Sequence, residues 1–137
     1  MIVVDTNILA HFWLPSDTTG LCDELYQKDS QWIAPILWKS EFRNVVSLYL
    51  RKSLIDLAEA LLILEKAELQ MKEREFQVNS VQVLNYVNQS SCSSYDCEFI
   101  SLAKDLDVNL GTLDKQLLRE FPGIAIHPEK LLLAKDK

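Results

Sequence analysis

Residues 1–12 read MIVVDTNILAHF, an apolar run that stops at Asp5 and resumes at Ile8. The run predicts a short buried strand over residues 2–4, and the segment after it predicts a helix over residues 6–13. A carboxylate at this point accepts hydrogen bonds from the free amides of a first helical turn, so Asp5 fits a helix N-cap. Capping alone explains the acid. The rest of the chain decides whether it has a second role.

The same arrangement returns at Asp114. Residues 108–112, VNLGT, predict a strand, and a helix follows from residue 114. In an open parallel sheet, ligands bind outside the carboxyl ends of the strands, where loops lead into helices. Two strands would therefore deliver the carboxylates of Asp5 and Asp114 to the same edge of the molecule.

Glu41 lies in LWKSEFRNVV (37–46), at helical spacing from Leu37 and Val45. A glutamate beside an apolar stripe is costly unless it is paired, protonated or bound to a cation. An ion pair with Arg43 or a place at the exposed rim would also explain it. These alternatives stay open.

Asp96 follows Ser93 at the spacing of a capping box, which is sufficient to explain an acid there. Phe99 and Ile100 follow at helical intervals and put Asp96 on the core-facing side of the helix start. From that position the side chain can point into a cleft.

Short apolar runs alternate with helical stretches, a pattern typical of an α/β fold with a mainly parallel sheet covered by helices. Strands are predicted at residues 2–4, 32–34, 76–78, 108–112 and 124–126, and helices at about 6–13, 18–28, 37–51, 58–69, 80–89, 93–107 and from 114. The helices over 37–70 form a hairpin. We expect residues 1–137 to be a single domain, with a peripheral C-terminal tail over about 128–137.

Acidic side chains outnumber basic ones 20 to 14, giving a net charge of −6. This balance argues against binding nucleic acid through a broad basic face, because nonspecific affinity comes from neutralising phosphates. A bound divalent cation can reverse the local sign of an acidic cleft, so a nucleic-acid enzyme is not excluded. With no secretory leader or membrane-spanning run in the sequence, we expect a cytoplasmic protein.

The four acids come from separate helix starts and have no histidine or cysteine partner at ligand spacing; the three cysteines are read as structural thiols. Mg²⁺ and Mn²⁺ prefer oxygen ligands and commonly bridge a carboxylate cluster to substrate phosphate. Without such an ion, gathering the acids would cost repulsive energy.

Three stretches together resemble the PIN domain family, in particular the VapC-type toxins of bacterial toxin–antitoxin modules: VVDTNIL (3–9), PILWKSEFRNVV (35–46) and SSYDCEFISLAKDLDVNLGTLD (93–114). The order of the acids, the DTN tripeptide and the closing Thr-x-Asp all match. The resemblance implies a three-layer α/β/α sandwich and RNA cleavage that depends on Mg²⁺ or Mn²⁺ and leaves 5′-phosphate and 3′-hydroxyl ends. It implies Asp5, Glu41, Asp96 and Asp114 as catalytic and metal-binding residues, with Thr6, Asn7 and Thr112 positioning them or a water.

One departure from the family matters. Some relatives carry another acid a few residues after the last motif Asp, whereas this chain has Lys115, Gln116 and Leu117 there. Whether one or two metal ions act is therefore left open.

The resemblance also implies protein partners: an antitoxin with a basic segment whose arginine lies beside the carboxylates, and a homodimer, for which the hairpin at 37–70 is a candidate surface. RNA binding would need a local rim of positively charged side chains. The substrate-binding candidates are Lys39, Arg43 and Lys115, followed by Arg51, Lys52 and Arg119.

Other functions fit less well. A haloacid-dehalogenase type phosphatase also begins with an Asp after its first strand, but it needs a second acid two residues on, where this chain has Asn7. A response-regulator receiver needs an Asp after a middle strand, and neither WIAP (32–35) nor FQVNS (76–80) supplies one. A stand-alone RNA-processing nuclease and a catalytically silent metal-binding module remain as alternatives.

Overall fold

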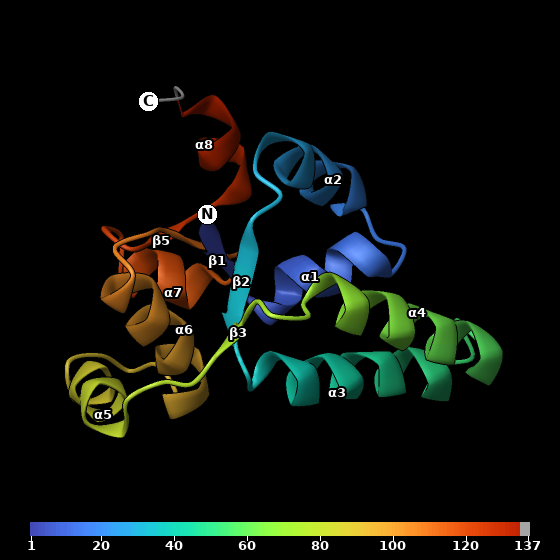
Figure 1. Cartoon of the computed structure of the whole chain (residues 1–137), viewed down its shortest axis with the longest axis horizontal. Helices are drawn as coiled ribbons and strands as arrows, with labels where there is room; N and C mark the ends of the chain where they lie inside the picture. Colours follow the sequence, from blue (N-terminus) through green and yellow to red (C-terminus); the bar gives the residue numbers. More distant parts are fainter. Residues whose placement is uncertain (135–137) are drawn as a thin grey trace.

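A five-stranded sheet forms the centre of the molecule, and each pair of neighbouring strands is parallel. The computed structural model describes residues 1–134. The strands, in the order β3-β2-β1-β4-β5, are β1 Ile2–Val4, β2 Trp32–Pro35, β3 Glu75–Phe76, β4 Leu110–Gly111 and β5 Ala125–Ile126 (Figure 1). The predicted parallel sheet is confirmed, although β3 and β4 are shorter than the strands expected at 76–78 and 108–112.

Helices cover both faces of this sheet. Within residues 1–134 they are α1 Thr6–Trp13, α2 Thr19–Lys28, α3 Trp38–Arg51, α4 Leu57–Gln70, α5 Ser80–Asn88, α6 Ser94–Asp105, α7 Lys115–Glu120 and α8 Pro128–Leu133. Helices α1 to α4 lie on one side of the sheet and α5 to α7 on the other (Figure 1). This is the expected three-layer arrangement. None of these helices is both long and apolar enough to cross a membrane.

Strand β1 occupies the middle of the sheet because all three of its residues are apolar and buried, as a strand covered on both faces requires. It pairs with β2 on one side and β4 on the other, so the direction in which the chain adds strands reverses between β1 and β4. Open α/β sheets bind ligands at the carboxyl ends of the strands at such a reversal. Asp5 and Thr112 are the residues that directly follow these two strands.

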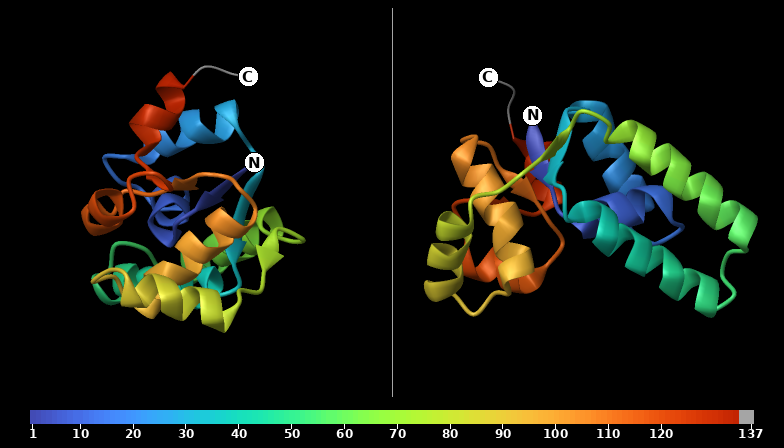
Figure 2. Two further views of the ribbon diagram at one scale, coloured as in Figure 1. Left: turned by 90° about the vertical axis from the view of Figure 1, so that its left-hand side faces the viewer. Right: turned by 60° about the horizontal axis from the view of Figure 1, so that its bottom comes forward.

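The expected hairpin is formed by α3 and α4, which pack side by side and project away from the sheet (Figure 2). Ser53, in the turn between them, has a positive φ of 57°. Helix α4 begins with a capping box: Asp56 Oδ1 accepts from the Glu59 N–H at 2.8 Å, and Glu59 Oε1 accepts from the Asp56 N–H at 3.2 Å. The first backbone N–H groups of a helix have no acceptor within the helix, and a capping box supplies acceptors for two backbone N–H groups.

The chain after β5 differs from the expected peripheral tail, because residues 128–133 form α8, which packs against α2. Leu131 is buried, and a Cβ at Gly111 would lie only 3.3 Å from its Cδ1 atom. The Lys28 ammonium donates to the carbonyl oxygens of Leu131 and Leu132, both at 2.9 Å, and so satisfies carbonyls at the end of the helix. Residues 135–137 of the predicted tail lie outside the described part of the chain.

Candidate functional site

Asp5 is fixed between the ends of β1 and β4. Its N–H donates to the Gly111 carbonyl oxygen at 2.9 Å, which continues the pairing of the two strands. Its Oδ1 atom accepts from the Thr6 N–H at 2.8 Å and caps α1, while Oδ2 accepts from the Thr112 hydroxyl at 2.7 Å. The helix-capping interpretation is therefore correct, and it does not use the second oxygen.

Asn7 and Thr112 connect this carboxylate to the loop after β4. The Asn7 amide lies 3.4 Å from Asp5 Oδ2 and 3.5 Å from Thr112 Oγ1, both long and therefore weak contacts. Asn7 Oδ1 accepts from the Leu113 N–H at 3.3 Å, and Thr112 Oγ1 accepts from the Asp114 N–H at 3.0 Å. These bonds hold the start of α1 and the start of α7 in one network.

Asp114 stands before α7 as Asp5 stands before α1. Its Oδ1 atom accepts from the Leu117 N–H at 3.0 Å and caps the helix. The side chain is half-buried. The repeat seen in the sequence thus corresponds to two helix starts at adjoining strand ends.

The other two acids come from the first turns of α3 and α6. Glu41 Oε1 accepts from the Thr6 hydroxyl at 2.8 Å, which links α3 to the start of α1. Asp96 follows Ser93, whose Oγ atom accepts from the Asp96 N–H at 3.1 Å as the N-cap. Both carboxylates are half-buried.

All four acids line a single cavity of about 510 Å³. Its lining residues are Asp5, Thr6, Asn7, Ala10, His11, Leu37, Ser40, Glu41, Asn44, Val45, Tyr95, Asp96 and Asp114. Thr112 does not line the cavity, and it contacts Asp5 from behind through its hydroxyl. The structure thus brings together acids that are up to 109 residues apart, Asp5 and Asp114.

Burial and mutual repulsion raise the pKa of three of these acids. Burial raises the pKa of Asp5 to about 7, against the hydrogen bond from Thr112, and the charges of Asp96 and Glu41 raise it further. Burial also raises the pKa of Glu41, with a contribution from Asp96, and that of Asp96, with a contribution from Asp114. No ion pair within residues 1–134 involves any of the four. A cation in the cavity would relieve this repulsion.

Comparison with protein-family models matches residues 2–123 to the PIN domain, a span that includes all four acids. The chain belongs to the PIN domain family. PIN domains are typically nucleases. No protein of curated function was found to match the sequence.

Solved structures similar to this PIN domain share its fold at low sequence identity. PAE2754 from Pyrobaculum aerophilum has a TM-score of 0.76 and 22% identity, over 96% of this chain and 93% of that one. FitAcB from Neisseria gonorrhoeae has a TM-score of 0.71 and 15% identity, over 94% and 99%. FitAB bound to an IR36 DNA fragment has a TM-score of 0.69 and 16% identity, over 93% and 95%. These likenesses confirm the α/β architecture.

PIN domains usually use divalent metal ions, and the oxygen donors of this cavity are of the type that Mg²⁺ and Mn²⁺ prefer. Among residues 1–134, no three His, Cys, Asp or Glu side chains are grouped so that they could hold an ion by themselves. Mg²⁺ commonly takes only one or two protein carboxylates and fills its remaining positions with water and substrate phosphate. The acids of this cavity fit that mode of binding and not a closed cage of protein ligands.

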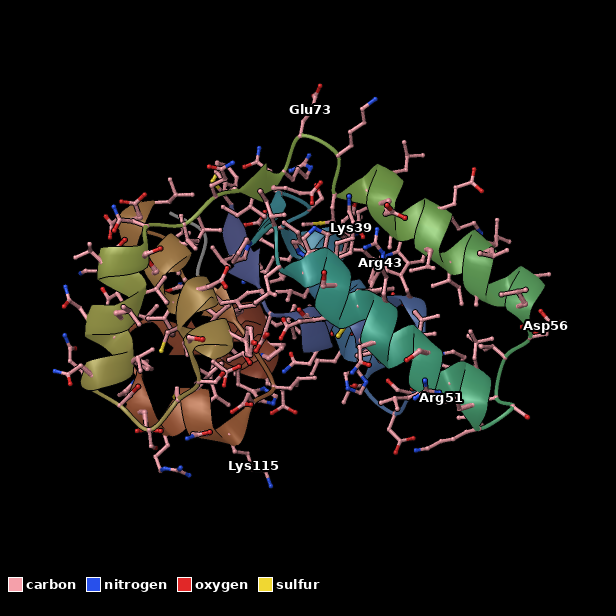
Figure 3. All side chains as sticks on the ribbon, turned by 90° about the horizontal axis from the view of Figure 1, so that it is seen from below. Lys39, Arg43, Arg51, Asp56, Glu73 and Lys115 are labelled. Atoms are coloured by element: carbon pink, nitrogen blue, oxygen red, sulfur yellow. The ribbon has the colours of Figure 1, made fainter. Side chains whose placement is uncertain are left out.

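The predicted positive rim does not face the cavity. None of Lys39, Arg43, Arg51, Lys52, Lys115 and Arg119 lines it. Lys39 and Arg43 are each two residues from Glu41, and side chains two apart on a helix point in different directions. Figure 3 shows both on the side of α3 that faces α4, far from Lys115, and Lys39 lies 3.6 Å from Glu68 and 3.9 Å from Glu75. Neither Lys39 nor Arg43 lies beside the acids in the cavity, and contact with RNA outside the cavity stays a prediction.

Sequence reasoning missed four polar residues of the lining: His11, Ser40, Asn44 and Tyr95. Helical spacing could have identified two of them. His11 follows Asn7 by four residues, and Asn44 follows Glu41 by three, so each lies one turn along the same helix face. Tyr95 is adjacent to Asp96, and its position gave no such signal.

Proposed function

We propose that this PIN domain is an endoribonuclease that hydrolyses RNA phosphodiester bonds with Mg²⁺ or Mn²⁺ as cofactor and water as nucleophile. The observation that carries the proposal is the meeting of four acids from four separate segments in one cavity at the reversal point of the sheet. Their charges are not neutralised by lysine or arginine within residues 1–134. A cation and a phosphodiester are the chemical partners that such a cavity suits.

In this proposal, Asp5, Glu41, Asp96 and Asp114 hold the ion and orient the attacking water, one or two of them by direct contact with the ion and the others through bound water. A bound Mg²⁺ or Mn²⁺ supplies positive charge beside the phosphate and lowers the pKa of water. The Asp5 carboxylate accepts hydrogen bonds from the Thr6 backbone N–H and from the Thr112 hydroxyl. The Glu41 carboxylate accepts one from the Thr6 hydroxyl, which orients it. Because these bonds exist before substrate arrives, little reorganisation is needed during the reaction.

A nucleophilic water makes the 2′-hydroxyl of RNA unnecessary for attack. The expected products have 5′-phosphate and 3′-hydroxyl ends. Cyclic phosphate ends formed in EDTA would contradict the mechanism.

Cleavage of total RNA tests the activity. We expect cleavage in Mg²⁺ or Mn²⁺ and none in EDTA, with Asp96→Asn slower by roughly a hundredfold because a charged ligand is lost. Asp105→Asn is the matched control, since Asp105 is exposed at the end of α6 and does not line the cavity. Equal cleavage by wild type and Asp96→Asn would show that the activity comes from elsewhere.

We also propose a toxin role, with an antitoxin that places a basic segment in the cavity. The support is the resemblance to VapC-type toxins together with the unneutralised acids, to which an arginine can donate charge-assisted hydrogen bonds. A neighbouring gene whose product has a basic tail should yield a protein that co-purifies with wild type and blocks RNA cleavage. Cleavage that is unaffected by such a protein would favour a stand-alone RNA-processing nuclease.

We also propose that the chain forms a homodimer through the α3–α4 hairpin. Leu57, Leu61 and Leu69 of α4 are 62%, 56% and 72% exposed, so apolar surface is available there. Light scattering during gel filtration should give twice the 15.7 kDa chain mass, and Leu61→Ser should lower it. A monomeric mass for wild type at micromolar concentration would rule the dimer out.

A further inference from the structure

Two chemically different sets of residues line the cavity. The acids and their hydrogen-bonding partners are the first set, here called the acidic half. The second set, here called the neutral half, contains the uncharged polar residues His11, Ser40, Asn44 and Tyr95 and the apolar residues Ala10, Leu37 and Val45. Metal binding and water activation, the roles proposed above, need only the acidic half.

The neutral half extends from the acids by one helical turn on two packed helices. His11 lies four residues beyond Asn7 on α1, and Asn44 lies three beyond Glu41 on α3. One turn of an α-helix advances about 5.4 Å. A group bound in the neutral half is therefore beside whatever the acids bind, and not remote from it.

His11 is held with one ring nitrogen occupied. Its Nδ1 atom lies 2.6 Å from Ser16 Oγ, and Ser16 Oγ also accepts from the Thr18 N–H at 3.3 Å. The hydroxyl of Thr19 is 2.7 Å from the His11 carbonyl oxygen, which fixes the turn around this pair. This shell orients the imidazole from the side of Ser16.

The hydrogen bonds also determine what the ring can offer. The Ser16 hydroxyl can donate to His11 Nδ1 or accept from it, so Nε2 carries a proton in one neutral tautomer and a lone pair in the other. Burial lowers the pKa of His11 below its ordinary value, which favours the neutral ring. Within residues 1–134, Nε2 has no hydrogen-bond partner. The cavity lining thus contains an oriented imidazole whose free nitrogen can make one hydrogen bond.

Tyr95 contributes an aromatic surface at the same cavity. It precedes Asp96 in the first turn of α6, and 59% of the residue is exposed. Nucleic-acid-binding proteins use exposed aromatic rings to stack unpaired bases, at about 1–3 kcal/mol per base.

We propose that the neutral half of the cavity binds one unpaired nucleobase of the RNA, adjacent to the cleaved phosphate, by stacking on Tyr95 and by a hydrogen bond to Nε2 of His11. This inference rests on the proposed ribonuclease function. A base has apolar faces and polar edges, which match apolar lining between fixed polar groups. A second phosphate does not match, because no lysine or arginine lines the cavity. The substrate is therefore single-stranded at this nucleotide.

Binding measured without cleavage tests this subsite. The probes are fluorescein-labelled eight-nucleotide homopolymers of A, C and U, with the same strands paired to their complements. They are titrated by anisotropy in Ca²⁺ in place of Mg²⁺, so that the acids are neutralised, and a gel checks that the strands stay intact. Wild type should bind at least one single strand at least tenfold more tightly than its duplex. Tyr95→Ala should weaken that binding about tenfold, and Tyr95→Phe, which keeps the ring, should restore it to within about twofold.

His11→Phe tests the hydrogen bond separately. It keeps an aromatic ring but removes both ring nitrogens, so the differences in affinity among the three homopolymers should become smaller while Tyr95-dependent stacking remains. Asp105→Asn should match wild type throughout. Equal affinity for single strands and duplexes, or wild-type binding by Tyr95→Ala, would overturn the subsite.

The ribonuclease proposal and the base-binding proposal fail in distinguishable ways. If wild type neither binds nor cleaves RNA, both fail. If wild type cleaves total RNA in Mg²⁺ and Tyr95→Ala cleaves and binds equally well, the ribonuclease proposal stands and the base subsite is wrong.

Discussion

Asp5 combines two roles at the scale of a single residue. One carboxylate oxygen accepts from the first turn of α1 and the other accepts from the Thr112 hydroxyl, so hydrogen bonds hold both oxygens in place. It is also only 7% exposed, and its pKa is raised to about 7 by burial and by neighbouring acids. The ionised form is therefore destabilised in the folded protein whenever no cation is present.

Stability without divalent ions should consequently depend on pH through Asp5. The group ionises near 3.8 in the unfolded chain and near 7 in the folded protein, so the folded state holds an extra proton between these values. The free energy of unfolding must then fall as pH rises through this window, by roughly 2–3 kcal/mol between pH 5 and pH 8. Urea denaturation in EDTA should show this loss in wild type and a smaller loss in Asp5→Asn. The same pH dependence in both proteins would contradict the assignment.

Thr6 acts on the site through Glu41. Thr6→Val keeps the side-chain shape but removes the hydroxyl that donates to Glu41 at 2.8 Å. We expect RNA cleavage to fall roughly tenfold, as for other residues that orient metal ligands, with an apparent Mg²⁺ requirement shifted to higher concentration. Thr6→Ser should keep most of the activity. Wild-type Mg²⁺ dependence in Thr6→Val would show that this bond has no positioning role.

The meeting of the four acids in one cavity was readable from the sequence, because each acid lies at or within the first turn of a helix. The chemistry of these acids stays a prediction. The directions of the basic side chains were not readable. Lys39 and Arg43 are two residues from Glu41 in sequence, but the α-helix turns them toward α4. Helical direction, and not proximity along the chain, decides which side chains share a cavity.

Among the elements, the central strands and the α3–α4 hairpin follow from local apolar patterns, and α8 does not. Its lysines suggested a solvated tail, whereas Leu131 packs beside Gly111 and Lys28 binds its last carbonyls. These partners are 20 and 103 residues away in sequence, and so no local pattern indicates them.

Helix α8 should therefore contribute to stability. Leu131→Ala removes a buried side chain and should lower the free energy of unfolding by about 2–4 kcal/mol. Leu133→Ala, on the same helix but 84% exposed, should change it by less than about 0.5 kcal/mol. Chemical denaturation of the two variants beside wild type measures both effects. Equal stability of the two would mean that α8 is not docked in solution.

At the scale of the whole molecule, the site exists only because the sheet brings distant segments together. The chain reverses its strand order between β1 and β4, and α3 and α6 add acids from opposite layers of the fold. Sequence patterns predicted which acids belong together. They did not show the neutral half of the cavity, since His11, Asn44 and Tyr95 meet only in the folded chain.

The central claim is that the cavity lined by the four carboxylates binds a divalent ion, and Mn²⁺ binding measured by electron paramagnetic resonance tests it most directly. Wild type and the matched control Asp105→Asn should bind Mn²⁺ with equal affinity, and Asp96→Asn should bind at least tenfold more weakly. Mn²⁺ affinity that is the same in all three proteins would contradict the claim.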